Sequence, residues 1–215
     1  DPSKQRLPRS LDELARYDVI VLGRGIEHVL PSETIERLPD YVAKRGGRLV
    51  MARGRPYSPA TAEGRAAGRA LGVLEPVVWG QGRISGPKLT LTSVGRSHPC
   101  FGFARNRPAD EVTAKLPALS HAGVIQRAKA AARVLARTRA VGTAGREQGQ
   151  PAIASMPYGR GLVLAVLGEG LWKWRLMAER NEKVHRLFGH FWSSAVRWLA
   201  MGNEYQPGKP LALRL

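Results

Sequence analysis

Three arginines and one glutamate follow apolar runs of the chain, where a binding site or an active site is expected. Arg24 lies between two glycines, Arg53 and Arg55 flank Gly54, and Glu169 follows the last apolar run. If these runs are strands of a parallel sheet, their carboxyl ends form a crevice, the usual ligand position in such sheets. Guanidinium groups in a crevice favour an anionic substrate. One hypothesis is therefore an enzyme with a relocated active site here.

A short aromatic and basic stretch, from Trp172 to Arg175, is the second candidate binding site. Trp172, Trp174 and Arg175 could stack on a ligand or on the side chain of a protein partner. The alternative is that one tryptophan packs inward while Arg175 pairs with a carboxylate such as Asp18 or Glu169. We favour packing, and we keep the three residues as a surface candidate.

The single cysteine, Cys100, is a weak candidate nucleophile. His98 lies two residues away, but neighbours at that spacing rarely meet productively in an extended segment. A lone cysteine beside a phenylalanine is more often a small buried apolar side chain. One cysteine also excludes an intramolecular disulfide and a cysteine-based zinc site.

No metal site and no cofactor site is predicted. His185 and His190 are five residues apart on an expected helix, which turns them about 140° from each other. Residues 23–25 lack the third glycine of a dinucleotide-binding loop.

The first half of the chain contains a strand, a helix and a second strand in succession. Residues 16–23 are an apolar run closed by glycine, which predicts a buried strand. Ser32 is expected to cap a helix that Gly46 and Gly47 stop. Residues 48–53 predict the second strand. This order indicates a parallel sheet with helices on its faces.

The middle of the chain is less regular. Residues 60–71 have helical periodicity, and residues 73–79 and 88–92 resemble strands separated by a turn at residues 80–82. We expect little regular structure in residues 96–122. Residues 126–140 are ambiguous from propensity alone, because their composition favours a helix while Val134 to Ala136 fits a short strand.

The last third predicts a β-hairpin followed by a long amphipathic helix. Residues 152–156 and 162–167 form the hairpin around a turn that contains glycine. The helix carries an apolar stripe, which we expect to cover one face of the sheet rather than to bind a cofactor. The stripe consists of Val184, Leu187, Phe188, Phe191, Trp192, Ala195, Val196 and Leu199.

Composition predicts a strongly basic domain with one core. The 215 residues carry 34 Lys and Arg against 17 Asp and Glu, a net charge of +17. This charge attracts nucleic acid, anionic lipid or acidic proteins. The basic residues are spread along the chain without a nucleic-acid-binding module, so a nucleic acid partner is not favoured. A basic domain that binds nucleic acid or anionic lipid stays as an alternative, and its affinity would fall steeply with salt.

Six segments in a fixed order resemble the glutamine-amidotransferase-like domain of large bacterial membrane proteins, over residues 10–202. They are Tyr17 to Gly23, Tyr41 to Val50, Ser97-His98-Pro99, Tyr158-Gly159-Arg160-Gly161, Trp172-Lys173-Trp174-Arg175 and Phe191 to Leu199.

The resemblance implies a particular α/β fold. This is a class I glutamine-amidotransferase-like, flavodoxin-like three-layer sandwich with a mostly parallel central sheet, a C-terminal β-hairpin and a long amphipathic helix. It also implies a strand at residues 132–136. We expect residues 1–202 to form this domain. Residues 203–215 would be a tail or the truncated start of a β-sandwich.

The residues expected for glutaminase chemistry are absent. The family's Gly-x-Cys-x-Gly elbow would fall on residues 50–54, which places Ala52 where a nucleophile is required. The His-x-Glu pair would place Leu167 at the base and would leave Glu169 as the carboxylate. No Cys, Ser or Thr occurs from Met51 to Tyr57, so a slip of the alignment changes nothing.

The resemblance and the lost triad together favour a non-catalytic binding or assembly module of a membrane-associated protein. A protein or a component of the cell envelope is the expected partner. No apolar stretch of the sequence is long enough to span a membrane. The resemblance implies flanking transmembrane helices in the full-length protein. The domain is expected outside the cytoplasm, with a cytoplasmic location as the alternative.

Overall fold

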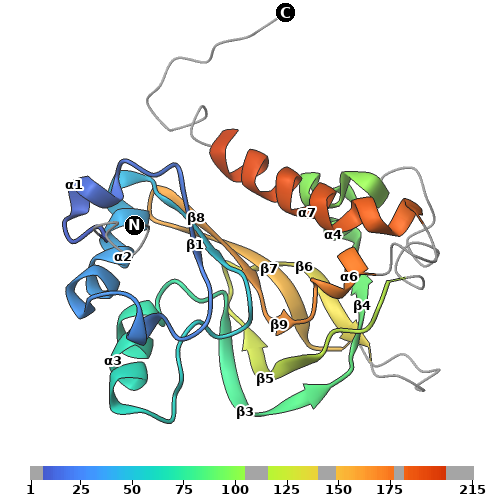
Figure 1. Cartoon of the computed structure of the whole chain (residues 1–215), viewed down its shortest axis with the longest axis horizontal. Helices are drawn as coiled ribbons and strands as arrows, with labels where there is room; N and C mark the ends of the chain where they lie inside the picture. The colour runs from blue at the N-terminus through green and yellow to red at the C-terminus, as the bar shows by residue number, and fades with distance from the viewer. Residues whose placement is uncertain (1–6, 105–115, 140–148, 177–181, 202–215) are drawn as a thin grey trace, which may run out of the picture.

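A six-stranded sheet runs through the centre of the molecule, in the order β1-β2-β8-β7-β6-β4 (Figure 1). The computed structural model describes residues 7–104, 116–139, 149–176 and 182–201. The strands are β1 (Val19–Leu22), β2 (Arg48–Met51), β4 (Lys88–Leu91), β6 (Arg133–Arg139), β7 (Pro151–Tyr158) and β8 (Gly161–Val166). Helices accompany the sheet, so the α/β class is confirmed.

The sheet is mixed, not mostly parallel. β1, β2 and β8 pair in parallel, and Leu49 lies between Ile20 and Val163. β7 pairs antiparallel with β8 in the predicted hairpin, and the pairs β6–β7 and β4–β6 are also antiparallel. The expected parallel arrangement therefore holds for the half that contains the βαβ unit, because only that unit has a helical crossover between neighbouring strands.

The helix α2 (Ser32–Arg45) connects β1 to β2. Gly46 ends it with a positive φ of 70°, as the glycine pair predicted. The prediction that Ser32 caps this helix is wrong. Pro31 has the extended backbone of the cap position, and Ser32 is already the first helical residue, so no side chain caps the helix.

Helices cover the sheet on both faces (Figure 1). On one face, α1 (Leu11–Leu14), α2 and α3 (Ala62–Leu71) contribute buried residues such as Leu14, Leu38 and Leu71 to a core with Leu49 and Val163. Burial of these apolar side chains is the main stabilising contribution of this layer.

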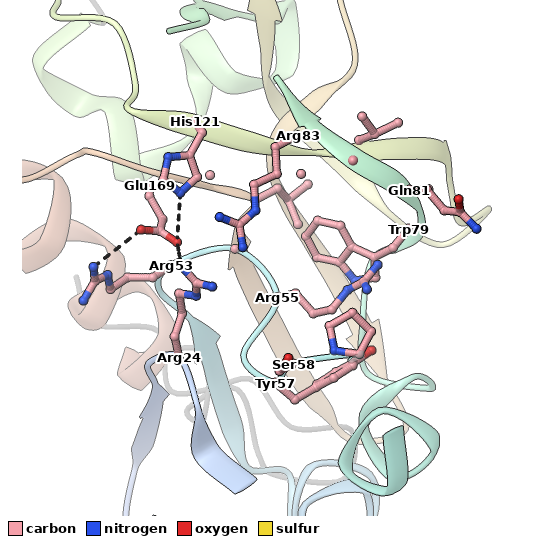
Figure 2. A pocket seen from close by; sticks show the side chains of 18 of the residues that line it. Arg24, Arg53, Arg55, Tyr57, Ser58, Trp79, Gln81, Arg83, His121 and Glu169 are labelled. Carbon is pink, nitrogen blue, oxygen red and sulfur yellow. Dashed lines mark hydrogen bonds and ion pairs between the residues drawn. The ribbon is translucent and has the colours of Figure 1, made fainter. Parts of the chain in front are cut away.

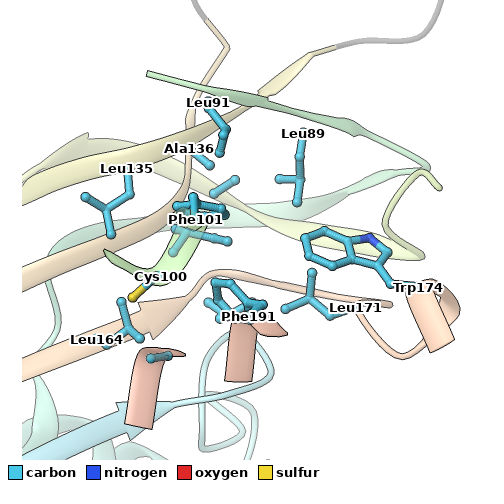
Figure 3. Packing of buried hydrophobic residues seen from close by; sticks show 14 of the residues in the cluster. Leu89, Leu91, Cys100, Phe101, Leu135, Ala136, Leu164, Leu171, Trp174 and Phe191 are labelled. Atoms are coloured by element: carbon cyan, nitrogen blue, oxygen red, sulfur yellow. The ribbon is translucent and has the colours of Figure 1, made fainter. Parts of the chain in front are cut away.

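On the other face lies α7 (Glu182–Met201) (Figure 1). Phe191, Ala195 and Leu199 of the predicted stripe are buried against Leu164 and Phe101 (Figure 3). Leu187, Phe188 and Trp192 pack against this core more loosely. Val196 is 40% exposed, so it lies at the margin of the stripe. The side chain of Val184 lies outside the described part.

A second sheet of three strands, β3 (Val77–Ser85), β5 (His121–Ala128) and β9 (Gly168–Glu169), stands beside the central sheet. The predicted turn at residues 80–82 is wrong, because these residues continue β3 through an irregular register with β5. Glycine-rich sequence predicted a turn from local preference, whereas pairing with β5 keeps the segment extended.

Residues 96–122 contain more regular structure than predicted. Within them the structure describes the end of α4 (Ser93–Ser97), the short helix η3 (Pro99–Ala104) and the start of β5. The ambiguous segment 126–140 divides into the end of β5 and β6, so the strand that the resemblance implied is present. The tail at residues 203–215 lies outside the described residues. None of the helices in the described ranges is long and apolar enough to cross a membrane.

Candidate functional site

A pocket of about 490 Å³ opens between the carboxyl ends of β1, β2 and β8 and the three-stranded sheet (Figure 2). We call it the arginine pocket, because four arginines line it. Besides Arg24, Arg53, Arg55 and Arg83, its polar side chains are Tyr57, Ser58, Trp79, Gln81, His121 and Glu169. Its volume is in the range of small-molecule sites.

Glu169 contacts three basic side chains on one side of the arginine pocket. Arg24 Nη1 donates a hydrogen bond to Glu169 Oε1, and Arg53 Nη2 lies 3.5 Å from Oε2. His121 Nε2 lies 3.3 Å from Oε1 without forming a hydrogen bond. The carboxylate side chain is 13% exposed. It therefore still presents acceptor atoms to the pocket.

Arg55 is held between two aromatic rings on the other side. Its guanidinium carbon lies 4.9 Å from the centre of the Trp79 ring and 5.8 Å from that of Tyr57. Such cation–π contacts fix the plane of the guanidinium. Arg55 is therefore pre-organised for a planar, bidentate contact.

The buried carboxylate of Glu75 accepts a hydrogen bond from each of these two aromatic side chains. Trp79 Nε1 donates to Glu75 Oε1 at 2.8 Å, and the Tyr57 hydroxyl donates to Oε2 at 3.2 Å. Burial raises the pKa of Glu75, and hydrogen bonds from the two rings partly offset this effect. Burial also raises the pKa of Tyr57, and the carboxylate of Glu75 adds to that shift. Both rings thus keep their protons and their orientation.

Gly123 on β5 makes room for the Trp79 ring. A Cβ atom at this position would lie 2.9 Å from the ring, closer than van der Waals contact allows. Trp79 therefore lies between the backbone of Gly123 and the guanidinium of Arg55, which explains why a glycine occupies the interior of this strand.

Hydrogen bonds connect the loop after β1 to the loop after β2 beside the pocket. Ser58 N donates to Glu27 Oε1 at 2.8 Å, and Ile26 N donates to Pro56 O at 3.1 Å. Gly54 has a φ of 73°, which favours glycine, and its N–H donates to Val166 O at 2.7 Å. These bonds fix the positions of the arginines on either side of Gly54.

Positive charge exceeds negative charge in the arginine pocket. Glu169 is the one carboxylate that lines it, against four arginines. Arg24 and Arg53 are paired with Glu169. Neither Arg55 nor Arg83 forms an ion pair with any carboxylate in the described ranges. The pocket is therefore complementary to an anion near these two arginines.

The structure brings four of the predicted site residues together and separates the others from them. Arg24, Arg53, Arg55 and Glu169 share the arginine pocket, while Trp172, Trp174 and Arg175 do not line it.

Of the separated residues, Trp174 is fully buried, with its ring 6.0 Å from that of Phe191, and Trp172 is 49% exposed. The burial of Trp174 fits the alternative in which one of the two tryptophans packs inward. Arg175 is exposed, and Glu169 pairs with Arg24 and Arg53 instead of Arg175.

Trp79, Arg83 and His121 also line the pocket, but we did not predict them from the sequence. The signal for two of them was present, because Trp79, Gln81 and Arg83 alternate as residues on one face of a strand do. The two intervening glycines suggested a turn instead. His121 follows a long irregular segment, and no local pattern connects it with Glu169.

The positions at which the resemblance places a catalytic triad carry no nucleophile. Ala52 follows β2, its N–H donates to Leu22 O at 2.9 Å, and its side chain is a methyl group. Leu167 is buried at the wall of the pocket. No cluster of three or more potential metal-ligating side chains occurs in the part of the chain that the structure describes.

Cys100 is buried in the core beneath α7, as predicted for an apolar role (Figure 3). Burial raises the pKa of its thiol to about 12. His98 Nδ1 accepts a hydrogen bond from the Cys100 backbone N–H at 3.3 Å. Burial, with a smaller contribution from Arg133, lowers the pKa of His98 to about 4. This pair does not line the arginine pocket.

Comparison with known proteins gives relatives in structure alone. No family model and no curated protein matches this chain. Two cytoplasmic proteins of Salmonella typhimurium, STM3548 and STM1381, have the same fold, with TM-scores of 0.64 and 0.63 and identities of 18% and 21%; each match covers 90% of this chain and 76% of the other. A ThuA-like protein of Bacteroides uniformis matches with a TM-score of 0.53 at 15% identity, over 89% of this chain and 72% of the other. At these identities the likeness shows the fold.

Proposed function

We propose that this chain is a non-catalytic binding domain of the class I glutamine-amidotransferase-like type, and that its ligand presents an anionic group to the arginine pocket. The ligand is free or is carried by a protein or cell-envelope partner. The observation that carries the proposal is the pair Arg55 and Arg83. They line the pocket without an ion pair to any carboxylate of the described residues, while Trp79 and Tyr57 hold Arg55 in place.

The position of the pocket supports a binding role. It lies at the carboxyl ends of the parallel strands, where the fixed backbone of β1, β2 and β8 orients the side chains of the following loops. Polar groups converge there on a site of ligand size, and an anion would meet the guanidinium of Arg55, which two aromatic rings already orient. Little conformational entropy would then be lost on binding.

The absence of glutaminase chemistry is supported by the residues at the triad positions. A methyl group at Ala52 cannot attack an amide, and Leu167 cannot accept a proton. Purified protein incubated with glutamine should therefore release no ammonia. Ammonia release that disappears in Cys100→Ser would overturn this part of the proposal.

Anion binding is tested by titrating the protein with inorganic phosphate in a calorimeter at low salt. We expect saturable binding that the double substitution Arg55→Ala, Arg83→Ala abolishes. The control is Arg37→Ala, which removes one positive charge from an exposed position on α2. Loss of binding in the control as well would indicate attraction by the net charge rather than a site.

The assembly role rests on the resemblance described above. We propose that the domain is part of a membrane-anchored protein and lies outside the cytoplasm. Fractionation of cells that express the full-length gene product, followed by protease treatment of intact cells, tests both points. Recovery in the soluble fraction would contradict the membrane anchor.

An enzyme with a relocated active site is the second candidate, and the proximity of His121 and Glu169 favours it. A histidine 3.3 Å from a carboxylate at the wall of a pocket is a common acid–base arrangement. Turnover of a bound anionic ligand that is lost in His121→Ala would support this candidate. Binding without turnover favours the binding domain.

A further inference from the structure

The arginine pocket has two chemically different sides (Figure 2). Arg55, from the loop after β2, lies beside Trp79 and Tyr57, and Arg83, from β3, extends between Arg55 and Glu169 (Figure 2). Neither arginine forms an ion pair with a carboxylate among the described residues, and we call the two the cationic side. On the other side, Glu169 from β9 offers carboxylate oxygens between Arg24 and Arg53. A ligand that fills the pocket must satisfy both sides.

The cationic side matches a doubly charged group. Arg55 and Arg83 carry two positive charges that no described ion pair neutralises. A phosphate monoester carries a charge between about −1.5 and −2 near neutral pH and has three acceptor oxygens. The guanidinium fork suits these oxygens, and the aromatic rings already fix the fork of Arg55. A single carboxylate would leave one of the two arginines unmatched.

The Glu169 side requires hydrogen-bond donors. An ionised carboxylate only accepts hydrogen bonds, so a ligand atom placed beside it must donate. A fully ionised anionic group has no proton to donate to this carboxylate. A ligand ammonium group would face Arg24 and Arg53, whose charges repel it. Neutral hydroxyl groups satisfy the carboxylate without either cost.

The pocket has room for more than a bare anion. Its volume of about 490 Å³ corresponds to roughly sixteen waters at about 30 Å³ each. An inorganic phosphate ion at the cationic side would leave most of this space, including the Glu169 side, to water. A ligand that fills this space has an organic part that extends from Arg55 and Arg83 toward Glu169.

We infer that the arginine pocket binds a phosphate monoester whose organic part carries hydroxyl groups, with the phosphate on Arg55 and Arg83 and a hydroxyl on Glu169. This inference rests on the proposed anion-binding function and specifies its ligand class. Glu169 is then a specificity residue, because its acceptor oxygens distinguish a hydroxylated ester from a plain one.

The test compares two esters that share the same phosphate group. Glycerol 3-phosphate carries two hydroxyls and ethyl phosphate carries none. Calorimetric titration should give an affinity for glycerol 3-phosphate about tenfold higher, the contribution of one hydrogen bond to a charged acceptor. Glu169→Ala should reduce this preference to about one, while ethyl phosphate still binds. Glu63→Ala, at an exposed position on α3, should keep the preference.

The possible outcomes distinguish hydroxyl recognition by Glu169 from the proposed binding of an anion. Equal affinity of the two esters in the wild-type protein would overturn the hydroxyl inference and leave anion binding intact. A preference for glycerol 3-phosphate that persists in Glu169→Ala would overturn the role of Glu169. The same holds for Glu169→Gln, a variant of similar shape. Failure of both esters and of inorganic phosphate to bind would overturn the proposed function itself.

Discussion

The guanidinium carbon of Arg55 lies 4.9 Å from the centre of the Trp79 ring, and the indole N–H of Trp79 donates to the buried carboxylate of Glu75. A buried acid on one side of the ring therefore sets the orientation of a cation on the other side. This chain of contacts connects the core with the arginine pocket.

Replacing Trp79 should weaken anion binding although the residue carries no charge. Trp79→Ala removes the surface that orients Arg55, and a cation–π contact contributes about 0.5 to 2 kcal/mol, or roughly two- to thirtyfold in affinity. Phosphate titration of the folded variant measures the effect. Trp172→Ala, a half-exposed tryptophan outside the pocket, is the matched control. Equal affinity of Trp79→Ala and wild type would show that Arg55 needs no orientation.

Gly123 should tolerate no side chain. Gly123→Ala places a methyl group 2.9 Å from the Trp79 ring, so the ring and Arg55 must move. We expect a loss of about 1 to 3 kcal/mol in the free energy of unfolding and weaker phosphate binding. Gly102→Ala is the control, since a Cβ there meets nothing within 4 Å. Urea denaturation measures stability, and a neutral Gly123→Ala would contradict the packing.

Glu75 should make stability depend on pH. Its pKa is raised above the ordinary 4.5 by burial, so the folded chain holds this proton to a higher pH than the unfolded chain. The unfolding free energy therefore falls as pH rises from about 4.5 through the raised pKa. The glutamine of the Glu75→Gln variant cannot ionise, so its unfolding free energy does not fall with pH for this reason.

Relative to wild type, the unfolding free energy of Glu75→Gln should thus increase with pH. Urea denaturation of both proteins at a series of pH values between about 4.5 and 8 gives the difference. Glu63→Gln, on the surface of α3, should show a flat difference. A Glu75→Gln difference that stays flat or decreases with pH would refute the effect of burial.

Cys100 should be unreactive in the folded protein. With a thiol pKa of about 12 and no exposure, it has almost no accessible thiolate at pH 8. A chromogenic disulfide reagent should label it slowly under native conditions and fully in urea. Cys100→Ser should lower the unfolding free energy by about 1 to 3 kcal/mol, because a hydroxyl would be buried in an apolar core. Rapid labelling of the native protein would be inconsistent with this burial.

Phe191 should be critical for the core beneath α7. Its ring packs against Phe101 at 5.4 Å and Trp174 at 6.0 Å between ring centres. Phe191→Ala should lower the unfolding free energy by about 3 to 5 kcal/mol through the cavity it leaves. Val196→Ala, on the same helix but 40% exposed, should change it by less than about 0.5 kcal/mol. Similar effects of both substitutions would argue against the assigned face of the helix.

Local patterns in the sequence were sufficient for much of the central sheet. The apolar runs of β1 and β2, the glycine stop after α2 and the hairpin of β7 and β8 depend on interactions between residues close in the chain. The apolar stripe of α7 identified Phe191, Ala195 and Leu199 as core residues. The expected mostly parallel character did not extend to β6 and β4, because strand direction there depends on connections that local patterns do not specify.

The amino-acid sequence by itself determined the α/β class, the βαβ unit and the placement of Arg24, Arg53 and Arg55 after strands. Only the tertiary structure decided that Trp79, Arg83 and His121 face these arginines, because β3 and β5 meet the loops of the central sheet through contacts between residues far apart in the chain. The physical reason is that a residue's type and neighbours fix its local conformation, whereas the pairing of β9 with β5 brings Glu169 and His121 together.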